Sequence, residues 1–360
     1  REMVETGNWI SPTVNYSPHF NKPAFVYWLM ATSYTLFGVS EFTARLPSAL
    51  FMMGTVLLQY AFVRRWFGST VGITSALMLL LNLEMVAIGR MALMDSVLTF
   101  FTTLAIYGVW MGLHGEGKER RLIWLFYIGM GFGTMAKGPI GFLVPAMALI
   151  PYLTLTKQWG TFRREGTPAL GLLLFVAIAL PWYAVMLSIH GEGYLAAAKG
   201  DTVGRFLNPI GGHGGTIFFY IPILLFGFFP WSAFLPSAVK QIYRSWRTRT
   251  QALTNPTEPG TGSEIPQPVR TTELELFCAL WLTVGFLFFS FSSTRLPHYI
   301  GPLFPAAAVL AARYWHRCLL SADHPGYRLS IKVMMGLGYL FGFALAATPM
   351  LYDTFIVKIA

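Results

Sequence analysis

The sequence predicts an all-α polytopic membrane protein, with a bundle of transmembrane helices and further helices lying on one membrane surface. Of its 360 residues, 54% are hydrophobic and 12% are charged, whereas about 25% of the residues of a soluble domain are charged. Mean hydropathy is +0.53, and the 30 Phe, 16 Tyr and 11 Trp suit aromatic belts at two membrane interfaces. A soluble fold could not cover its surface with so few charges, so most of the apolar surface must face lipid.

Residues 1–44 are expected to form an outer loop with interfacial helices. The apolar run 24–39 spans 16 residues, about 24 Å as a helix, which is short for a hydrocarbon core of about 30 Å. Tyr, Trp and Thr residues interrupt this run. The pattern therefore favours a helix on the outer membrane surface rather than a span.

Residues 45–238 are expected to form a transmembrane bundle that includes a long outer loop at 189–216, and residues 276–360 to add further transmembrane helices. Between them, residues 239–275 are expected to form a cytoplasmic linker, because the stretch 250–272 is rich in Pro, Thr and Gly. Several apolar runs are shorter than the ~20 residues of a straight span, so their boundaries are approximate. The runs that could cross the membrane fall at 45–63, 70–88, 93–113, 122–136, 139–155, 169–188, 217–238, 276–292, 301–317 and 331–351.

The beginning of the sequence and the two cysteines give two further expectations. The chain begins with Arg1 in a polar stretch without a charged-then-apolar leader. We expect that a preceding span is missing and that the chain is truncated at its N-terminus. Cys278 and Cys318 lie in or beside apolar runs, which favours packing residues over a disulfide.

The net charge of +10 does not indicate a nucleic-acid partner. If successive connections alternate between two sides, 17 of the 26 Lys and Arg residues fall on one side, as expected for the cytoplasmic side of a membrane protein. Cations close to a membrane boundary are costly unless they serve an anion. The remaining nine therefore predict an electropositive pocket for a phosphate at the outer surface: Arg1, Lys22, Arg45, Arg90, Lys137, Lys199, Arg205, Arg295 and Lys358.

Two of these cations are lysines followed closely by proline. Lys22 precedes Pro23 in the segment HFNKP at 19–23, and Pro suits the first turn of a helix, so Lys22 and a helix N-terminus could share one phosphate. Lys137 lies at the tip of a tight hairpin, KGP at 137–139. Gly and Pro explain the turn but not the lysine. For both lysines the alternative is a side chain that reaches lipid headgroups without a specific ligand.

Asp95 is the carboxylate candidate of the site. It falls at the start of the apolar run 93–113, where a carboxylate is favoured by the helix dipole alone or as an N-cap. A carboxylate at membrane depth also needs a cation. Arg90, five residues earlier, is poorly spaced for a pair on one helix face, so the partner is expected from another segment, such as Lys22 or Lys137.

The later candidates lie in two outer connections. Arg295 can hold phosphate oxygens with two parallel hydrogen bonds, and Tyr299 is either a ligand or a belt aromatic. Arg205 and His213 lie in the long outer loop, where His213 is flanked by glycines and is either a loop residue or a metal ligand. The sequence contains none of the usual P-loop, DxD, HExxH or CxxC motifs.

The order and spacing of these short motifs resemble the bacterial polyprenyl-phosphate-dependent glycosyltransferases. This is the superfamily of protein O-mannosyltransferase and the lipid A aminoarabinose transferase, of the GT-C type and glycosyltransferase family 39-like. The resemblance is carried by a Gly-Asn-Trp segment at 7–9, KP at 22–23, SEF at 40–42, RLPSA at 45–49, the segment 90–95, and AKGP at 136–139. It is strongest over residues 1–145 and continues more weakly to Tyr299.

The resemblance implies a GT-C helical bundle whose site faces the periplasm of a bacterial inner membrane. It implies a sugar transfer from a polyprenyl phosphate, with inversion, to an acceptor hydroxyl on a lipid, glycan or protein. By matching positions, Lys22 and Lys137 would bind the donor phosphate, with Arg295, Arg90 and Arg205 as further candidates. Asp95 would position these charges or act as the base. His19, Tyr299 and His213 would line the substrate cavity.

Three departures from the family pattern affect these expectations. Asn21 replaces an often acidic residue that relatives link to a metal, which puts a divalent metal in doubt; no cofactor is assigned, and His19 and His213 are the remaining candidate ligands. The acidic motif that supplies the general base in relatives would lie just before Arg1. Glu2 and Glu5 are then expected to be solvated charges at a helix end. We therefore expect this chain to bind the phosphate and to transfer little sugar.

A transporter or flippase for an anionic lipid-linked sugar is the alternative, since it could use the same outer cations. Such a protein is expected to show inverted repeats or broken helices at the membrane midplane, and the sequence shows neither. The sequence does not identify the sugar, the acceptor or the length of the polyprenol.

Overall fold

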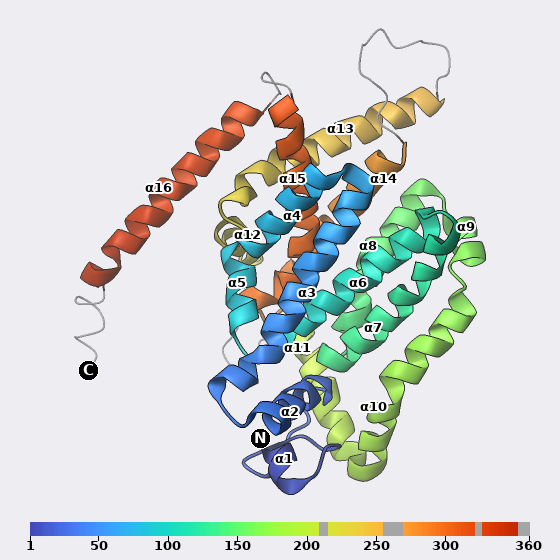
Figure 1. Ribbon diagram of the computed structural model, residues 1–360, viewed down its shortest axis with the longest axis vertical. Helices are drawn as coiled ribbons and strands as arrows, with labels where there is room; N and C mark the ends of the chain where they lie inside the picture. Colours follow the sequence, from blue (N-terminus) through green and yellow to red (C-terminus); the bar gives the residue numbers. More distant parts are fainter. Residues whose placement is uncertain (209–214, 255–268, 321–325, 352–360) are drawn as a thin grey trace.

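The computed structural model describes residues 1–208, 215–254, 269–320 and 326–351. Long helices run side by side in an elongated bundle, and the short helices α1 and α2 lie beyond one end of it (Figure 1). The final helix, α16, stands apart from the bundle along most of its length. The all-α membrane architecture predicted from composition is therefore confirmed.

The elements follow the apolar runs of the sequence. The first half contains α1 (Glu2–Thr6), β1 (Thr13–Val14), β2 (Ser17–Pro18), α2 (Phe25–Phe37), α3 (Glu41–Phe67), α4 (Ser69–Leu80), α5 (Leu83–Arg90), α6 (Met94–His114), η1 (Gly117–Ile123), α7 (Trp124–Lys137), α8 (Ile140–Thr156) and α9 (Trp159–Glu165). The second half contains α10 (Pro168–Lys199), η2 (Gly200–Gly204), α11 (Arg205–Leu207), α12 (Tyr220–Gly227), η3 (Trp231–Phe234), α13 (Leu235–Thr254), α14 (Val269–Phe291), η4 (Pro297–Leu303), α15 (Phe304–Leu320) and α16 (Tyr327–Leu351).

Five described helices are long and apolar enough to cross a membrane alone: α3, α6, α10 with its continuation to Leu207, α14 and α16. Two further pairs of helices qualify together, although each pair is bent. The pair α4 and α5 bends by 62°, and α12 bends by 110° against the segment Trp231–Trp246. Each of the ten predicted apolar runs overlaps one or more helices. The helices concerned are those named above and the shorter α7, α8 and α15.

The bends correct two expectations. No broken helix was predicted from the sequence, and the run 217–238 was expected to be a single span. At the first break, the buried Asn82 accepts a hydrogen bond from the Met85 backbone N–H at 2.9 Å and donates to the carbonyls of Met78 and Leu79 at 3.1 and 2.6 Å. A break at membrane depth is stable when the freed backbone groups find such partners.

Helical structure also extends into two segments that were expected to be irregular. The linker predicted at 239–275 is helical at both ends, since α13 continues to Thr254 and α14 begins at Val269; residues 255–268 lie outside the described residues. The outer loop predicted at 189–216 is helical as far as Leu207, through α10, η2 and α11. Both segments are polar, so hydropathy alone did not reveal them.

A short hairpin of β1 and β2 is fastened to α1 by two carboxylates. Thr13 pairs with Pro18 and Val14 with Ser17. Glu2 accepts hydrogen bonds from the Thr13 hydroxyl and from two backbone N–H groups of the turn, and these bonds lower the pKa of the Glu2 carboxyl. Glu5 binds Arg1 at 2.6 Å and accepts from the Tyr16 hydroxyl at 2.9 Å. Glu2 and Glu5 are thus accessible charges on the short helix α1, as expected, and they also hold the hairpin in place.

The hairpin of α7 and α8 is built on close contact between glycines. A Cβ placed on Gly141 would lie 2.0 Å from the carbonyl carbon of Gly133, so no other residue fits there without separating the two helices. Gly138, at the turn, has a φ of 78°, a conformation that side-chain-bearing residues rarely adopt. The tight turn fixes the position of Lys137, the last residue of α7.

Candidate functional site

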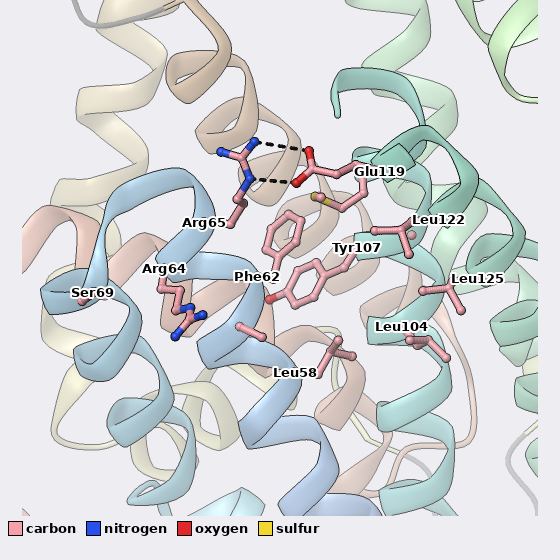
Figure 2. A pocket seen from close by; sticks show the side chains of 13 residues that line it. Leu58, Phe62, Arg64, Arg65, Ser69, Leu104, Tyr107, Glu119, Leu122 and Leu125 are labelled. Atoms are coloured by element: carbon pink, nitrogen blue, oxygen red, sulfur yellow. Dashed lines mark hydrogen bonds and ion pairs between the residues drawn. The ribbon is translucent and has the colours of Figure 1, made fainter. Parts of the chain in front are cut away.

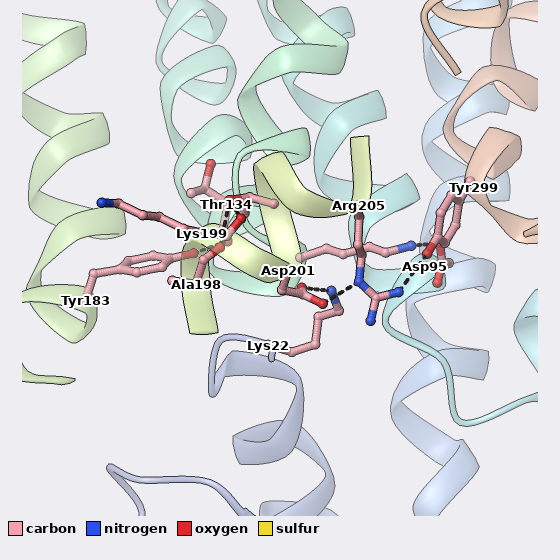
Figure 3. Close-up of polar contacts among 11 residues, drawn as sticks. Lys22, Asp95, Thr134, Tyr183, Ala198, Lys199, Asp201, Arg205 and Tyr299 are labelled. Atoms are coloured by element: carbon pink, nitrogen blue, oxygen red, sulfur yellow. Dashed lines mark hydrogen bonds and ion pairs between the residues drawn. The ribbon is translucent and has the colours of Figure 1, made fainter. Parts of the chain in front are cut away.

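Five segments from different parts of the chain meet at the end of the bundle nearest α1 and α2 (Figure 1), and Figure 3 shows the polar contacts among their side chains. They are the loop before α2, the start of α6, the end of α7, the turn η2 with α11, and the start of η4. Each of them contributes a charged or hydrogen-bonding side chain. We call Lys22, Asp95, Lys137, Asp201, Arg205, His298 and Tyr299 the charged cluster.

Asp95 and Lys137 form the most buried ion pair of the cluster. Lys137 Nζ lies 2.6 Å from Asp95 Oδ1, and the two side chains are 12% and 3% exposed. Asp95 lies in the first turn of α6, but Leu93 occupies the N-cap position and no side chain caps this helix end. The N-cap alternative is therefore wrong for Asp95, whereas its favourable position relative to the helix dipole remains.

Lys22 and Arg205 share a second carboxylate, Asp201. Lys22 Nζ is ion-paired with Asp201 Oδ2, and Arg205 Nε donates to Asp201 Oδ1 at 2.5 Å. Asp201 is 8% exposed and lies in the π-helical turn η2 that follows α10. Such turns are rare and are often found at functional sites. Here the turn brings Asp201 to Lys22, which precedes it by 179 residues.

Tyr299 connects the Asp95–Lys137 pair with the two ion pairs of Asp201. Its hydroxyl accepts a hydrogen bond from Arg205 at 3.5 Å, and its ring centroid lies 4.3 Å from Lys137 Nζ. The neighbouring His298 has Nε2 at 3.8 Å from Asp95 Oδ2. With His298 neutral, three cations and two carboxylates leave the charged cluster with one excess positive charge.

Burial and neighbouring charges shift the pKa values of two side chains in the cluster, Lys22 and His298. Burial lowers the pKa of the Lys22 amine, the neighbouring Asp201 opposes that shift, and Lys137 and Arg205 add to it by charge repulsion. Burial also lowers the pKa of His298 below its ordinary value of 6.5, against the attraction of Asp95. The neutral form of His298 is therefore favoured. The Lys22 ammonium is repelled by two other cations, Lys137 and Arg205. Such a concentration of like charges is expected where an anion binds.

The structure does not bring every candidate into the cluster. Arg295 donates instead to the backbone carbonyls of Gly215 and Ser290, and Arg90 is exposed at the end of α5. His19 is half-buried and its backbone N–H binds the Pro12 carbonyl, with no described contact from its ring to the cluster. His213 lies outside the described residues.

Sequence reasoning missed Asp201 and His298 as members of this site. Asp201 precedes Arg205 by four residues, which is the spacing of an ion pair on a helix, but the segment was expected to be a loop. His298 was part of a recognised motif, RLPHY at 295–299, in which only the arginine and the tyrosine were chosen. The four-residue spacing between Asp201 and Arg205 could therefore have identified Asp201 as a site residue. No spacing in the sequence singled out His298.

Among the described residues, no group of three His, Cys, Asp or Glu side chains is close enough to hold an ion. The two carboxylates of the charged cluster are already paired with cations.

The chain is similar to several known proteins over most of its length. The family model described as dolichyl-phosphate-mannose-protein mannosyltransferase matches residues 21–184. The chain is 28% identical to undecaprenyl phosphate-alpha-4-amino-4-deoxy-L-arabinose arabinosyl transferase of Enterobacter sp. (strain 638), over 87% of this chain and 53% of the relative. It is 29% identical to undecaprenyl phosphate-alpha-4-amino-4-deoxy-L-arabinose arabinosyl transferase 2 of Pseudomonas fluorescens (strain Pf0-1), over 95% of this chain and 58% of the relative. The chain thus spans little more than half the length of these relatives.

The fold is similar to that of a solved membrane protein, ArnT from Cupriavidus metallidurans. The crystal structure of its apo state superposes with a TM-score of 0.77 at 24% identity, over 98% of this chain and 58% of ArnT. The structure of ArnT bound to undecaprenyl phosphate gives a TM-score of 0.78, over 97% and 59%. The GT-C fold and the resemblance to the polyprenyl-phosphate-dependent glycosyltransferases, both predicted from sequence motifs, are confirmed.

Proposed function

We propose that this chain is the donor-binding part of a membrane glycosyltransferase that takes a sugar from a polyprenyl phosphate. The observation that carries the proposal is the charged cluster. Lys22, Lys137 and Arg205 come from three separate segments and are held together by two carboxylates in spite of their mutual repulsion. Only an anionic ligand makes such a gathering of cations useful.

The charge of the cluster suits both the donor and the product. A sugar joined to a polyprenyl phosphate is a phosphodiester with one negative charge, which matches the one excess positive charge of the cluster. The phosphomonoester that leaves carries about −1.5 to −2 at pH 7. The cations therefore stabilise the departing group more strongly than the bound donor, as catalysis requires.

In the proposed reaction, the oxygen of an acceptor hydroxyl bonds to the anomeric carbon of the sugar while the bond from that carbon to the phosphate oxygen breaks. The acceptor is a hydroxyl on a lipid, glycan or protein, and its proton passes to a base. Attack from the face opposite the phosphate inverts the anomeric centre. Asp95 is already paired with Lys137, so we assign it the positioning of that lysine.

The relatives support the donor class, since the similar transferases are named for undecaprenyl phosphate-linked aminoarabinose and the similar structure was obtained with undecaprenyl phosphate. The basic residues support an orientation. Arg65, Arg120 and Arg270 lie at the end of the bundle opposite the charged cluster, in ion pairs with glutamates. By the positive-inside rule that end is cytoplasmic. We therefore propose a bacterial inner-membrane protein whose charged cluster faces the periplasm.

Binding of undecaprenyl phosphate to the purified chain tests the proposal. We expect Lys22→Met to weaken binding by about tenfold to a hundredfold, because a hydrogen bond to a charged group contributes about 1.5–3 kcal/mol. Arg45→Met is the control, since Arg45 is an exposed cation whose ion-pair partner among the described residues is the exposed Glu41, at 2.9 Å. Equal binding by the wild type and Lys22→Met would refute the proposal.

The same preparation separates a transferase from a flippase. Two bent spans are present here, so broken helices no longer distinguish the two classes. In vesicles, a flippase moves a labelled polyprenyl phosphate across the bilayer without any acceptor, whereas a transferase leaves the donor on its own side. We expect no movement above that of protein-free vesicles.

A further inference from the structure

A cavity lies between the end of α3 and the second half of α6, away from the charged cluster at the start of α6, and Figure 2 shows its lining side chains. It is a groove of about 540 Å³ between α3, the second half of α6, and the segment formed by η1 and the start of α7. This volume falls within the ~300–1,000 Å³ typical of small-molecule sites. It is lined by Leu58, Ala61, Phe62 and Tyr107, and by the charged side chains of Arg64, Arg65 and Glu119.

The floor of this groove is apolar and firmly fixed. Phe62 and Tyr107 stack face to face, with ring centroids 3.7 Å apart and an interplanar angle of 3°. The Tyr107 hydroxyl donates to Gln59, which in turn binds Ser75 and the Pro305 carbonyl. The Tyr107 hydroxyl and the Gln59 amide are therefore satisfied within the bundle. The groove itself is left with aromatic and aliphatic surfaces.

The rim of the groove is cationic. Arg65 binds Glu119 through two hydrogen bonds of 2.9 and 3.3 Å, which close one end of the groove. Arg64 is exposed, and its only described polar contact is the Tyr60 hydroxyl at 3.4 Å. The two arginines and one glutamate leave one excess positive charge. This charge lies about 10 Å along α3 from the apolar wall at Leu58.

We propose that this groove binds an anionic phospholipid of the adjacent leaflet, with an acyl chain on the Phe62 and Tyr107 floor and the phosphate beside Arg64 and Arg65. An apolar channel with a cation at one end matches the two parts of such a lipid. The groove also lies at the end of the bundle where basic residues predominate, which faces the anionic cytoplasmic leaflet in the proposed orientation. The site is separate from the charged cluster and does not depend on donor binding.

Native mass spectrometry of the detergent-purified chain with added phosphatidylglycerol tests the acyl-chain part. Ala61 is exposed on the wall of the groove, so Ala61→Trp fills the groove with little disturbance of the core. The control is Leu57→Trp, one helical turn earlier, where the side chain is 60% exposed and outside the groove. We expect Ala61→Trp to abolish the retained lipid and Leu57→Trp to keep it. Retention by both variants would overturn the proposal.

The headgroup part is tested by charge. Arg64→Gln should weaken phosphatidylglycerol binding about fivefold, the contribution of one basic residue near a membrane surface, whereas Lys118→Gln, an exposed cation of η1 outside the groove, should not. Phosphatidylcholine should bind more weakly than phosphatidylglycerol. Equal binding of the two lipids, or equal effects of the two variants, would overturn the assignment. Unchanged binding of undecaprenyl phosphate by Ala61→Trp verifies that the variant is folded and that the two sites are independent.

Discussion

The pair of Asp95 and Lys137 gives the sharpest quantitative expectation. Asp95→Asn removes the negative charge and keeps a side chain of the same shape, which leaves the Lys137 ammonium, 12% exposed, without its counter-charge. Removing one partner of a buried ion pair costs about 3–5 kcal/mol. Asparagine still accepts a hydrogen bond, so we expect a loss of about 3 kcal/mol in the free energy of unfolding. Lys137→Met should lose a similar amount by stranding the carboxylate.

The double variant separates this electrostatic coupling from ordinary damage to packing. With both charges gone, neither residue is stranded, so Asp95→Asn with Lys137→Met should be more stable than the sum of the single effects predicts. We expect a coupling energy of about 2 kcal/mol or more, since contacting residues typically show 0.5–3 kcal/mol. Unfolding in mixed detergent micelles, followed by tryptophan fluorescence, gives the four free energies that are needed.

Binding of undecaprenyl phosphate should not follow stability in this series. Asp95→Asn frees Lys137 from its fixed position, and Lys137→Met removes a cation, so both single variants and the double variant should bind more weakly than the wild type. A recovery of stability without a recovery of binding is the expected signature of a functional pair. A coupling energy below about 0.5 kcal/mol, or a double variant that binds as the wild type does, would refute the reasoning.

Four further outcomes follow from the structure. Asp201→Asn should weaken undecaprenyl phosphate binding by about tenfold, although it makes the site more positive, because its two cationic partners lose their anchor; tighter binding would contradict this. The pKa of His298 is lowered below 6.5 in the folded protein, so below pH 6.5 the unfolded chain binds a proton more readily than the folded one. The free energy of unfolding of the wild type should therefore fall relative to that of His298→Gln as the pH drops below 6.5. Parallel curves of unfolding free energy against pH would contradict this. Gly141→Ala should cost about 3 kcal/mol or more through the clash with α7, whereas Gly160→Ala, which has open space, should be tolerated; equal unfolding midpoints would contradict this. Chelation with EDTA should leave undecaprenyl phosphate binding unchanged, because the cluster's own side chains neutralise the phosphate, and a loss of binding would contradict this.

The agreement between sequence and structure is closest where the evidence is local. Membrane class, the ten apolar runs and the helix within 24–39 follow from hydropathy over a window of residues, and helix formation depends on such windows. The tight turn after Lys137 was also evident, because Gly and Pro mark turns by their own backbone preferences. The errors fall on polar helices, such as α13 and the end of α10, where hydropathy carries no signal.

The charge pattern identified candidates but could not pair them. Lys22, Lys137 and Arg205 were selected because topology left them unexplained, and all three lie in the charged cluster. Arg295 was selected by the same argument and instead binds backbone carbonyls. The difference depends on where the side chain points, which is set by the helices packed around it and not by neighbouring residues in the sequence.

Composition and hydropathy are properties of the chain alone, and they suffice to identify a helical membrane protein with cations that topology does not explain. The folded molecule adds that Lys22 meets Asp201, 179 residues away, and that Lys137 meets Asp95, 42 residues away. Ion pairs of this kind form between segments that are brought together by packing over the whole bundle. No local pattern records that packing, so the partners of each charge had to be read from the folded molecule.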